Sequence, residues 1–227
     1  NTADRLAGAA LAAAGMLEQP DAPPTLRREL ASLLTDLLTA GAGPREWAST
    51  GNTLGRLGDP RPGVGLRIDG ILDIVWCEVP GGPFIMGSKN DQLAYEERET
   101  PQREVSVQAF RIAKYPVANS QYAAFIEDGG YLERRYWTQT GWEWQARRDG
   151  LKTQAEARDL PNHPVGGVSW FEAVAFCKWL TDRFRERGDI EQWEAVVLPS
   201  EAQWEKAARG TDGRIFPWGD NGDPRKG

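Results

Sequence analysis

The sequence predicts an α+β fold in which a small helical segment precedes a loop-rich domain. The first observation is that leucine and alanine recur at helical spacing within residues 1–60. The second is a run of glycine and proline over residues 58–65, which interrupts any helix. The third is composition, because 25 Gly, 15 Pro and 10 Trp among 227 residues indicate many turns around a core filled by tryptophan. We therefore expect a helical segment at 1–60, a linker at 61–70 and a second domain at 71–227.

The helical segment is predicted to contain three short helices, at Ala3–Leu17, Leu26–Leu38 and Pro44–Leu57. They resemble units of a helical repeat, and such units cannot bury an apolar face alone. We expect them to pack on one another, on the second domain, or on further repeats upstream. The apolar stripe expected on the first helix is formed by Leu6, Ala10, Leu11, Ala14 and Leu17.

The second domain is predicted to contain several strands. The first three lie at Ile71–Val79, Phe84–Met86 and Arg103–Lys114, and a short one lies at Val196–Leu198. Apolar residues alternate along Arg103–Lys114 and then change phase at Phe110. That change predicts either a bulge or burial on both faces.

Three helices are predicted in the same domain. Asn119 is expected to cap the first of them. The second spans Trp170–Arg187, with Cys177 on its inner face. Ser200 begins a capping box for the third, which is expected to bury Trp204.

Four motifs in fixed order within the second domain carry a family resemblance. They read Pro-Gly-Gly-Pro-Phe-Ile-Met-Gly-Ser at 80–88, Asn-His-Pro-Val-Gly-Gly-Val-Ser-Trp at 162–170, Leu-Pro-Ser-Glu-Ala-Gln-Trp-Glu-Lys-Ala-Ala-Arg-Gly at 198–210 and Phe-Pro-Trp-Gly-Asp at 216–220. In this order they resemble the formylglycine-generating enzyme, or sulfatase-modifying factor, family. The resemblance covers the chain from Trp76 to Asp220. It implies a loop-rich variant of the C-type lectin fold.

The chain departs from the family pattern in two respects. Val117-Ala118-Asn119 stands where family members usually carry Val-Thr-Asn. Members also continue into a Gly-Asn-Val-Trp-Glu-Trp motif and an Arg-Gly-Gly-Ser-Trp motif, and this sequence has neither. The resemblance therefore implies that the domain at 71–227 is incomplete at its C-terminus. Its missing C-terminal half is then a partner of this chain.

The enzymes of this family resemble copper oxidases, which convert a substrate cysteine to formylglycine. The resemblance implies that Cu(I) is held by two cysteines in the C-terminal half, and soft thiolates suit that metal. Cys77 and Cys177 do not stand at those motif positions. We expect both to be buried structural thiols in a reducing, cytoplasmic compartment. Copper is expected only if the missing half carries the cysteine pair.

His163 is the only histidine of the chain. A related branch of the superfamily, the sulfoxide synthases, holds iron through several histidines in an extra helical domain, which one histidine cannot do. His163 lies in a turn between Asn162 and Pro164, so we predict that it is a hydrogen-bonded loop residue. No Ser/His/Asp or Cys/His set can be assembled without it. We therefore assign no catalytic residue and place no cofactor.

Calcium stays open as a cofactor. Asp220, Asn221 and Asp223 alternate around Gly222, a spacing that weakly resembles a calcium loop. The resemblance adds that family members often bind calcium in the segment just beyond. A simple Gly-Asp turn is the alternative.

Residues 131–161 are predicted to be irregular, and aromatic and arginine residues cluster there. The candidate ligand or partner surface within this cluster is formed by Arg134, Arg135, Trp137, Trp142 and Trp144. Such residues anchor protein and peptide ligands, and they also stack on single-stranded nucleic acid. Packing into the core is a third alternative.

Charge and hydropathy exclude other classes of partner. The net charge is −6 and no block of Lys or Arg is present, which disfavours nucleic acid. No apolar run approaches the roughly 20 residues that cross a bilayer, so no membrane association is expected. Nothing at the start resembles a signal peptide.

Two functions are consistent with the sequence. The preferred one is a non-catalytic domain that recognises a protein or peptide. It resembles the formylglycine-generating-enzyme-like domains of bacterial signalling or conflict proteins, and the variable proteins of diversity-generating retroelements. The alternative is a copper-dependent formylglycine-generating oxidase that activates sulfatases, with its catalytic half absent from this chain.

Overall fold

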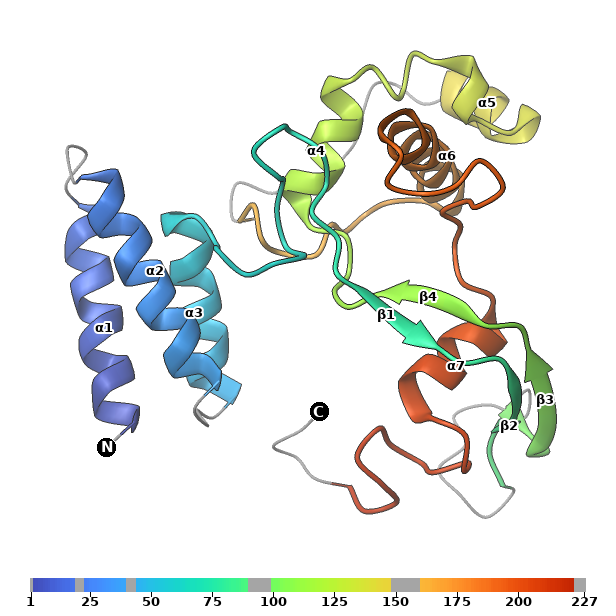
Figure 1. The fold of residues 1–227 in the computed structure, drawn as a ribbon, viewed down its shortest axis with the longest axis horizontal. Coiled ribbons are helices and arrows are strands. Elements are labelled where there is room, and N and C mark those ends of the chain that lie inside the picture. The colour runs from blue at the N-terminus through green and yellow to red at the C-terminus, as the bar shows by residue number, and fades with distance from the viewer. Residues whose placement is uncertain (1, 19–22, 40–43, 90–98, 148–159, 223–227) are drawn as a thin grey trace. The chain divides into compact units, whose positions relative to one another are not determined.

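A computed structural model describes residues 2–18, 23–39, 44–89, 99–147 and 160–222 (Figure 1). In chain order its elements are α1 (Thr2–Leu17), α2 (Pro24–Thr39), α3 (Pro44–Leu57), β1 (Trp76–Val79), β2 (Gly82–Met86), β3 (Arg103–Val107), β4 (Phe110–Ala113), α4 (Asn119–Glu127), the 3-10 helix η2 (Arg134–Tyr136), α5 (Gln139–Ala146), α6 (Trp170–Arg187) and α7 (Glu201–Arg209). Helices mixed with short strands confirm the predicted α+β class.

Contacts divide the chain into two compact units, each built from two separate stretches. One unit comprises Asn1–Val75 and Tyr115–Val197, and the other comprises Trp76–Lys114 and Leu198–Gly227. The helical segment therefore belongs to the same unit as helices α4 to α6. The linker and domain boundaries expected at residues 60 and 70 stay predictions, because a division by contacts does not locate a linker.

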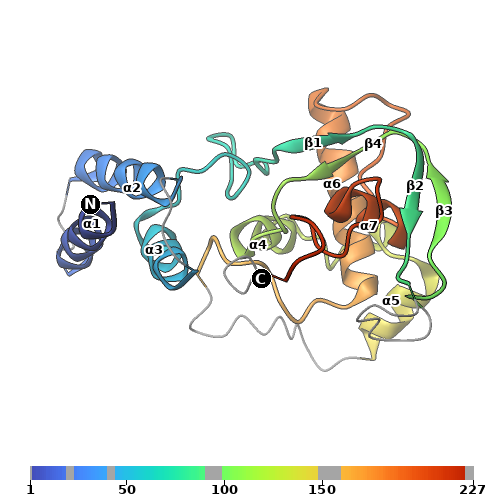
Figure 2. The same ribbon diagram turned by 90° about the horizontal axis from the view of Figure 1, so that it is seen from below.

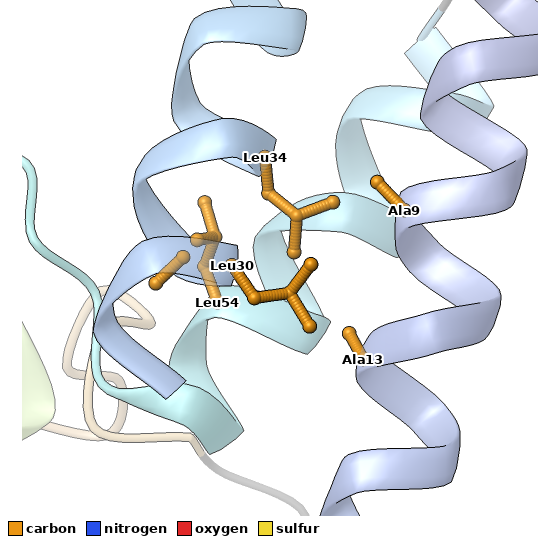
Figure 3. Close-up of a cluster of buried hydrophobic side chains, with 6 residues drawn as sticks. Ala9, Ala13, Leu30, Leu34 and Leu54 are labelled. Atoms are coloured by element: carbon orange, nitrogen blue, oxygen red, sulfur yellow. The ribbon is translucent and has the colours of Figure 1, made fainter. Parts of the chain in front are cut away.

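The three N-terminal helices cover one another's apolar faces. Figure 3 shows Leu30 and Leu34 of α2 and Leu54 of α3 gathered against Ala9 and Ala13 of α1. The stripe predicted for the first helix was wrong in phase. Leu11 is 76% exposed, whereas the inward positions are alanines. Small side chains let α1 lie close to its neighbours, whose leucines then fill the space between them.

The four strands form two antiparallel ribbons, β1 with β4 and β2 with β3 (Figure 2). The strand predicted over Arg103–Lys114 is two strands, because the chain leaves the ribbon with β2 after Val107 and pairs with β1 from Phe110 onward. The change of phase therefore marks a change of partner. Val196–Leu198, predicted as a strand, has no strand pairing.

Aromatic side chains of α4 and α6 build the core of the larger unit. The ring of Phe125 lies 5.8 Å from Phe176 and 5.6 Å from Trp179, measured between ring centroids. The ring of Tyr122 stacks on Phe176 at 5.5 Å. Aromatic pairs at these separations stabilise a core beyond the area that they bury. The prediction of a core filled by tryptophan is therefore confirmed only in part, because among the described residues Trp137 and Trp179 are buried, whereas Trp47, Trp170, Trp193 and Trp204 are exposed.

Gln121 fastens the Pro/Gly-rich stretch to helix α4. Its buried amide nitrogen Nε2 donates hydrogen bonds to the carbonyl oxygens of Gly65 at 3.1 Å and Asp73 at 2.7 Å. Its Oε1 accepts from the backbone N–H of Ala118 at 3.0 Å. Ala118 is thus the N-cap of α4, and the prediction that Asn119 caps this helix was wrong. Gln121 supplies one half of a capping box by accepting from the N-cap N–H, while Ala118 has no side-chain acceptor for the other half.

Candidate functional site

Helix α5 and the 3-10 helix η2 lie within the stretch that was predicted to be irregular. The side chain of Thr138 accepts a hydrogen bond from the N–H of Gly141 at 3.0 Å and so begins α5. Trp142 and Trp144 lie on this helix, and Arg134 and Arg135 lie on η2. The neighbouring Arg148, part of the same predicted cluster, lies outside the described residues.

Arg134 and Trp142 come together as a cation–π pair. The guanidinium carbon of Arg134 lies 5.7 Å from the centroid of the Trp142 ring. The Nη1 of Arg134 donates to the carbonyl oxygen of Trp137 at 2.9 Å, and Nη2 donates to the side chain of Gln139. These bonds hold the arginine in place on an exposed part of the chain.

Trp137 is not a surface residue, which corrects the prediction that it belongs to the ligand surface. Its side chain is 2% exposed, its Nε1 donates to the carbonyl of Gly130 at 3.0 Å, and its ring lies 5.4 Å from Tyr131. A buried tryptophan ring whose Nε1 has a hydrogen-bond acceptor is typical of a core residue. For this tryptophan the alternative of core packing is the correct one.

Arg135 and Trp144 are partly engaged by neighbouring side chains of the same unit. The exposed Arg135 donates from Nη2 to the hydroxyl of Tyr136 at 2.8 Å and lies 3.5 Å from the carboxylate of Asp182. Trp144 is half-buried, with its ring 5.5 Å from that of Phe171. The candidate surface is therefore reduced to Arg134, Arg135 and the outer parts of two tryptophans.

Trp170 extends this aromatic group, and the sequence reasoning did not assign it to the candidate surface. It is 62% exposed, and its ring meets Phe171 edge to face at 5.5 Å. Because Phe171 also contacts Trp144, three aromatic rings follow one another beside the start of α6. The sequence carries no signal for this exposure, because it depends on which side of α6 packs against other elements.

A buried chain of hydroxyl and carboxylate groups connects helices α4 and α6. The hydroxyl groups of Tyr122 and Tyr131 are 2.9 Å apart, and Tyr131 donates to Oε1 of Glu172 at 2.8 Å. Oε2 of Glu172 accepts from the N–H of Ser169 at 2.7 Å and completes the capping box of α6. Burial raises the pKa of both tyrosines above its usual range. The spacing Ser169-x-x-Glu172 was the sequence signal for this carboxylate.

The two cysteines differ in environment. Cys177 is buried on α6, as predicted, and burial raises the pKa of its thiol to about 11. Cys77 is exposed on β1, which corrects the prediction that both thiols are buried. The next residue of β1, Glu78, is exposed as well, and successive residues of a strand point to opposite faces, so neither face of the β1–β4 ribbon is covered at these two positions. Among the described residues, neither thiol belongs to a group of three or more His, Cys, Asp or Glu side chains that could hold a metal ion.

His163 has the hydrogen-bonded loop role that was predicted. Its Nε2 lies 2.8 Å from Oδ1 of Asn52 on α3. The neighbouring Asn162 donates from Nδ2 to the carbonyl of Gly51 at 2.9 Å and to Oδ2 of Asp59 at 2.8 Å. Burial alone would raise the pKa of Asp59, but hydrogen bonds from Arg61 and Asn162 lower it below its usual value. The described helical segment therefore contacts the rest of its unit through α3.

Helix α7 buries a cation rather than the tryptophan expected there. Trp204 is 61% exposed, so the prediction that it is buried was wrong. Lys206 is 3% exposed, and its Nζ donates to the carbonyl oxygens of Pro80 at 2.7 Å and Gly82 at 3.0 Å. The ammonium also lies 5.9 Å from the centroid of the Phe84 ring. The predicted capping box of this helix, Ser200 with Gln203, is confirmed.

The segment considered for calcium forms a turn. Oδ1 of Asp220 accepts from the N–H of Ile215 at 3.0 Å, and the carbonyl of Asn221 accepts from Nε1 of Trp218 at 3.0 Å. Asp223 lies outside the described residues. Across the described ranges, no group of three or more His, Cys, Asp or Glu side chains is placed to hold a metal ion. None of the helices in those ranges is long and apolar enough to cross a membrane.

Residues 74–227 match the family of sulfatase-modifying factor enzyme 1-like domains. The chain belongs to this family. It is 36% identical over 155 residues to hercynine oxygenase of Mycolicibacterium thermoresistibile, covering 61% of this chain and 32% of that protein. It is 34% identical over 175 residues to the formylglycine-generating enzyme of Thermomonospora curvata, covering 65% of this chain and 53% of that enzyme.

A mammalian relative is more distant but matches a longer stretch. The chain is 27% identical over 217 residues to the mouse formylglycine-generating enzyme, covering 82% of this chain and 51% of that enzyme. The chain spans between 32% and 53% of the lengths of these three relatives. Their names identify enzymes, so the family includes enzymes.

Proposed function

We propose that this chain is part of a non-catalytic recognition domain, built on the lectin-type fold, that binds a protein or peptide. The observation that supports this most directly is the contact of His163 with Asn52. The only histidine of the chain thereby joins two parts of the fold, and its ring nitrogen is engaged by an amide. Glu172 is likewise engaged in capping α6, and Cys177 is a buried thiol whose pKa is raised by burial.

Arginine on η2 and tryptophan on α5 and at the start of α6 supply the recognition surface in this proposal. Arg134 is stacked on Trp142, and Trp170 is exposed beside Phe171. Rigid aromatic side chains and arginine are the groups that carry most binding energy at protein interfaces, because they offer large contact area at small entropic cost. The variable proteins of diversity-generating retroelements and the domains of bacterial signalling proteins are the classes that this proposal favours.

A copper-dependent formylglycine-generating oxidase is the second candidate function. It is supported by the 34% identity to the formylglycine-generating enzyme of Thermomonospora curvata. In that case a further half of the domain, acting as partner of this chain, supplies the copper-binding cysteine pair. The side chains described here would then contribute to the shell around the active site.

Oxygen consumption by the full-length protein distinguishes the two functions. The protein is loaded with copper and mixed with a cysteine-containing sulfatase peptide, and the formylglycine-generating enzyme of Thermomonospora curvata is assayed in parallel. We expect peptide-dependent oxygen uptake from the control enzyme and none from this protein. Sustained uptake together with formylglycine in the peptide would replace the recognition function by the oxidase function.

A further inference from the structure

The turn at residues 160–165 contacts helix α3 on one side. The amide nitrogen of Asn162 donates to the carbonyl of Gly51 at 2.9 Å, and the ring of His163 lies 2.8 Å from Oδ1 of Asn52. Both contacts come from one turn of α3. The turn and the helix are far apart in the sequence, so these bonds depend on the packing between them.

Gly55 allows this close approach. A Cβ at that position would lie 2.3 Å from Oδ1 of Asn162 and 2.9 Å from Cβ of Leu160. In an α-helix the carbonyl of residue 51 faces the amide of residue 55, so the side chain of Asn162 reaches this carbonyl across the surface of residue 55. Gly51 lies on the same helix, and a Cβ there would meet no atom within 4 Å. The two glycines therefore form a matched pair for testing the contact.

The same turn holds the first residues of helix α4 on its other side. The N–H of Asn119 donates to the carbonyl of His163 at 2.8 Å, and the N–H of Ser120 donates to the carbonyl of Pro161 at 3.0 Å. The side chain of Asn119 donates to the carbonyl of Leu160 at 3.0 Å. The first N–H groups of a helix have no partner within the helix. For α4 these partners are supplied by the turn.

The segment that follows α3 adds a second connection. Asp59 accepts from Asn162 at 2.8 Å and is held by Arg61, whose Nη2 lies 2.6 Å from its Oδ2. The guanidinium of Arg61 lies 5.8 Å from the centroid of the Tyr115 ring, two residues before Val117. Val117 in turn accepts from the N–H of Val165 at 2.9 Å. Asp59 and Arg61 thus connect the end of α3 to the turn through Asn162 and to the chain leading into α4 through Tyr115.

We propose that the turn at 160–165 couples helix α3 to helix α4, so that release of α3 loosens the first turn of α4. One feature favours release. Oδ1 of Asn162 is buried and has no hydrogen-bond partner among the described residues, an arrangement that is unfavourable in the docked state and is relieved when water reaches it. Release of α3 therefore affects α4, whose Tyr122 begins the hydrogen-bonded chain to Tyr131 and Glu172. The coupling stands whether the family domain binds or catalyses.

Amide hydrogen exchange in the full-length protein tests the coupling. Gly55→Ala is compared with wild type and with Gly51→Ala as the matched control. We expect Gly55→Ala to accelerate exchange at Asn119 and Ser120 on the order of tenfold, because it opens the docked state. Gly51→Ala should leave the exchange rates of both amides unchanged. In either variant, the exchange rates of the α6 amides of Trp179 and Leu180 should also stay unchanged.

Two results overturn the proposal. One is acceleration confined to α3 in Gly55→Ala, with Asn119 and Ser120 as protected as in wild type. The other concerns the case in which Gly55→Ala accelerates exchange in α6 as much as in α4, so that the substitution acts on the whole fold. In that case the coupling is tested with Asn52→Ala, which removes only the contact with His163. Faster exchange at Asn119 and Ser120, with α6 unchanged, supports the coupling, and unchanged exchange at these two amides overturns it.

Discussion

At the scale of single residues, several polar groups in this chain owe their positions to folding rather than to reactivity. Lys206 is the clearest case, because its buried ammonium ends on two backbone carbonyls and a phenylalanine ring. A buried charge is tolerated only when hydrogen bonds replace its hydration. The cation in turn fixes the Pro80–Gly82 turn between β1 and β2. A similar role belongs to Gln121, whose amide holds the stretch from Gly65 to Asp73.

We predict that Lys206→Met lowers the free energy of unfolding by about 2 to 4 kcal/mol, because the carbonyls of Pro80 and Gly82 lose a charged donor that is itself buried. The exposed Lys178 is the matched control, and Lys178→Met should change the free energy of unfolding by less than about 0.5 kcal/mol. The midpoint of urea unfolding of the full-length protein measures both effects. Equal midpoints for the two variants would contradict the role assigned to Lys206.

At the scale of elements, the helix ends explain which predictions held. The capping box Ser200–Gln203 was predicted correctly because capping depends on residues that are three apart. Helix α5 was missed because its aromatic residues do not follow one apolar stripe. The consecutive strands β3 and β4 were predicted as one strand. The break between them depends on pairing of β4 with β1, whose residues are distant in the sequence.

Helix α6 provides the test at this scale. Its N-cap Ser169 accepts from the N–H of Glu172 at 3.3 Å, while Glu172 bonds back to the N–H of Ser169. We expect Ser169→Ala to cost about 1 kcal/mol of stability, because the first turn loses an acceptor. Ser169→Asp keeps an acceptor and should remain close to wild type in thermal unfolding. If Ser169→Asp is as unstable as Ser169→Ala, the cap is not what stabilises this end of α6.

At the scale of the whole molecule, the ordered motifs were sufficient to predict the family, and residues 74–227 confirm it. The site was predicted less well. Arginine and tryptophan in the 131–147 region were correctly picked out as a cluster, but burial separates Trp137 from Trp142 and Trp144. Neither the exposure of Cys77 nor that of Trp170 could be predicted, because both depend on which side of an element packs against another.

The central claim is that the side chains of this chain that resemble catalytic or metal-binding groups are structural. It is tested most directly by the Cu(I) affinity of the full-length protein compared with that of a Cys77→Ser, Cys177→Ala double variant. Cys177 is buried, Cys77 is exposed, and neither belongs to a metal-binding group of the described residues, so we predict that the two affinities are equal. A loss of about a hundredfold or more in the double variant would contradict the claim, because it would make these thiols metal ligands.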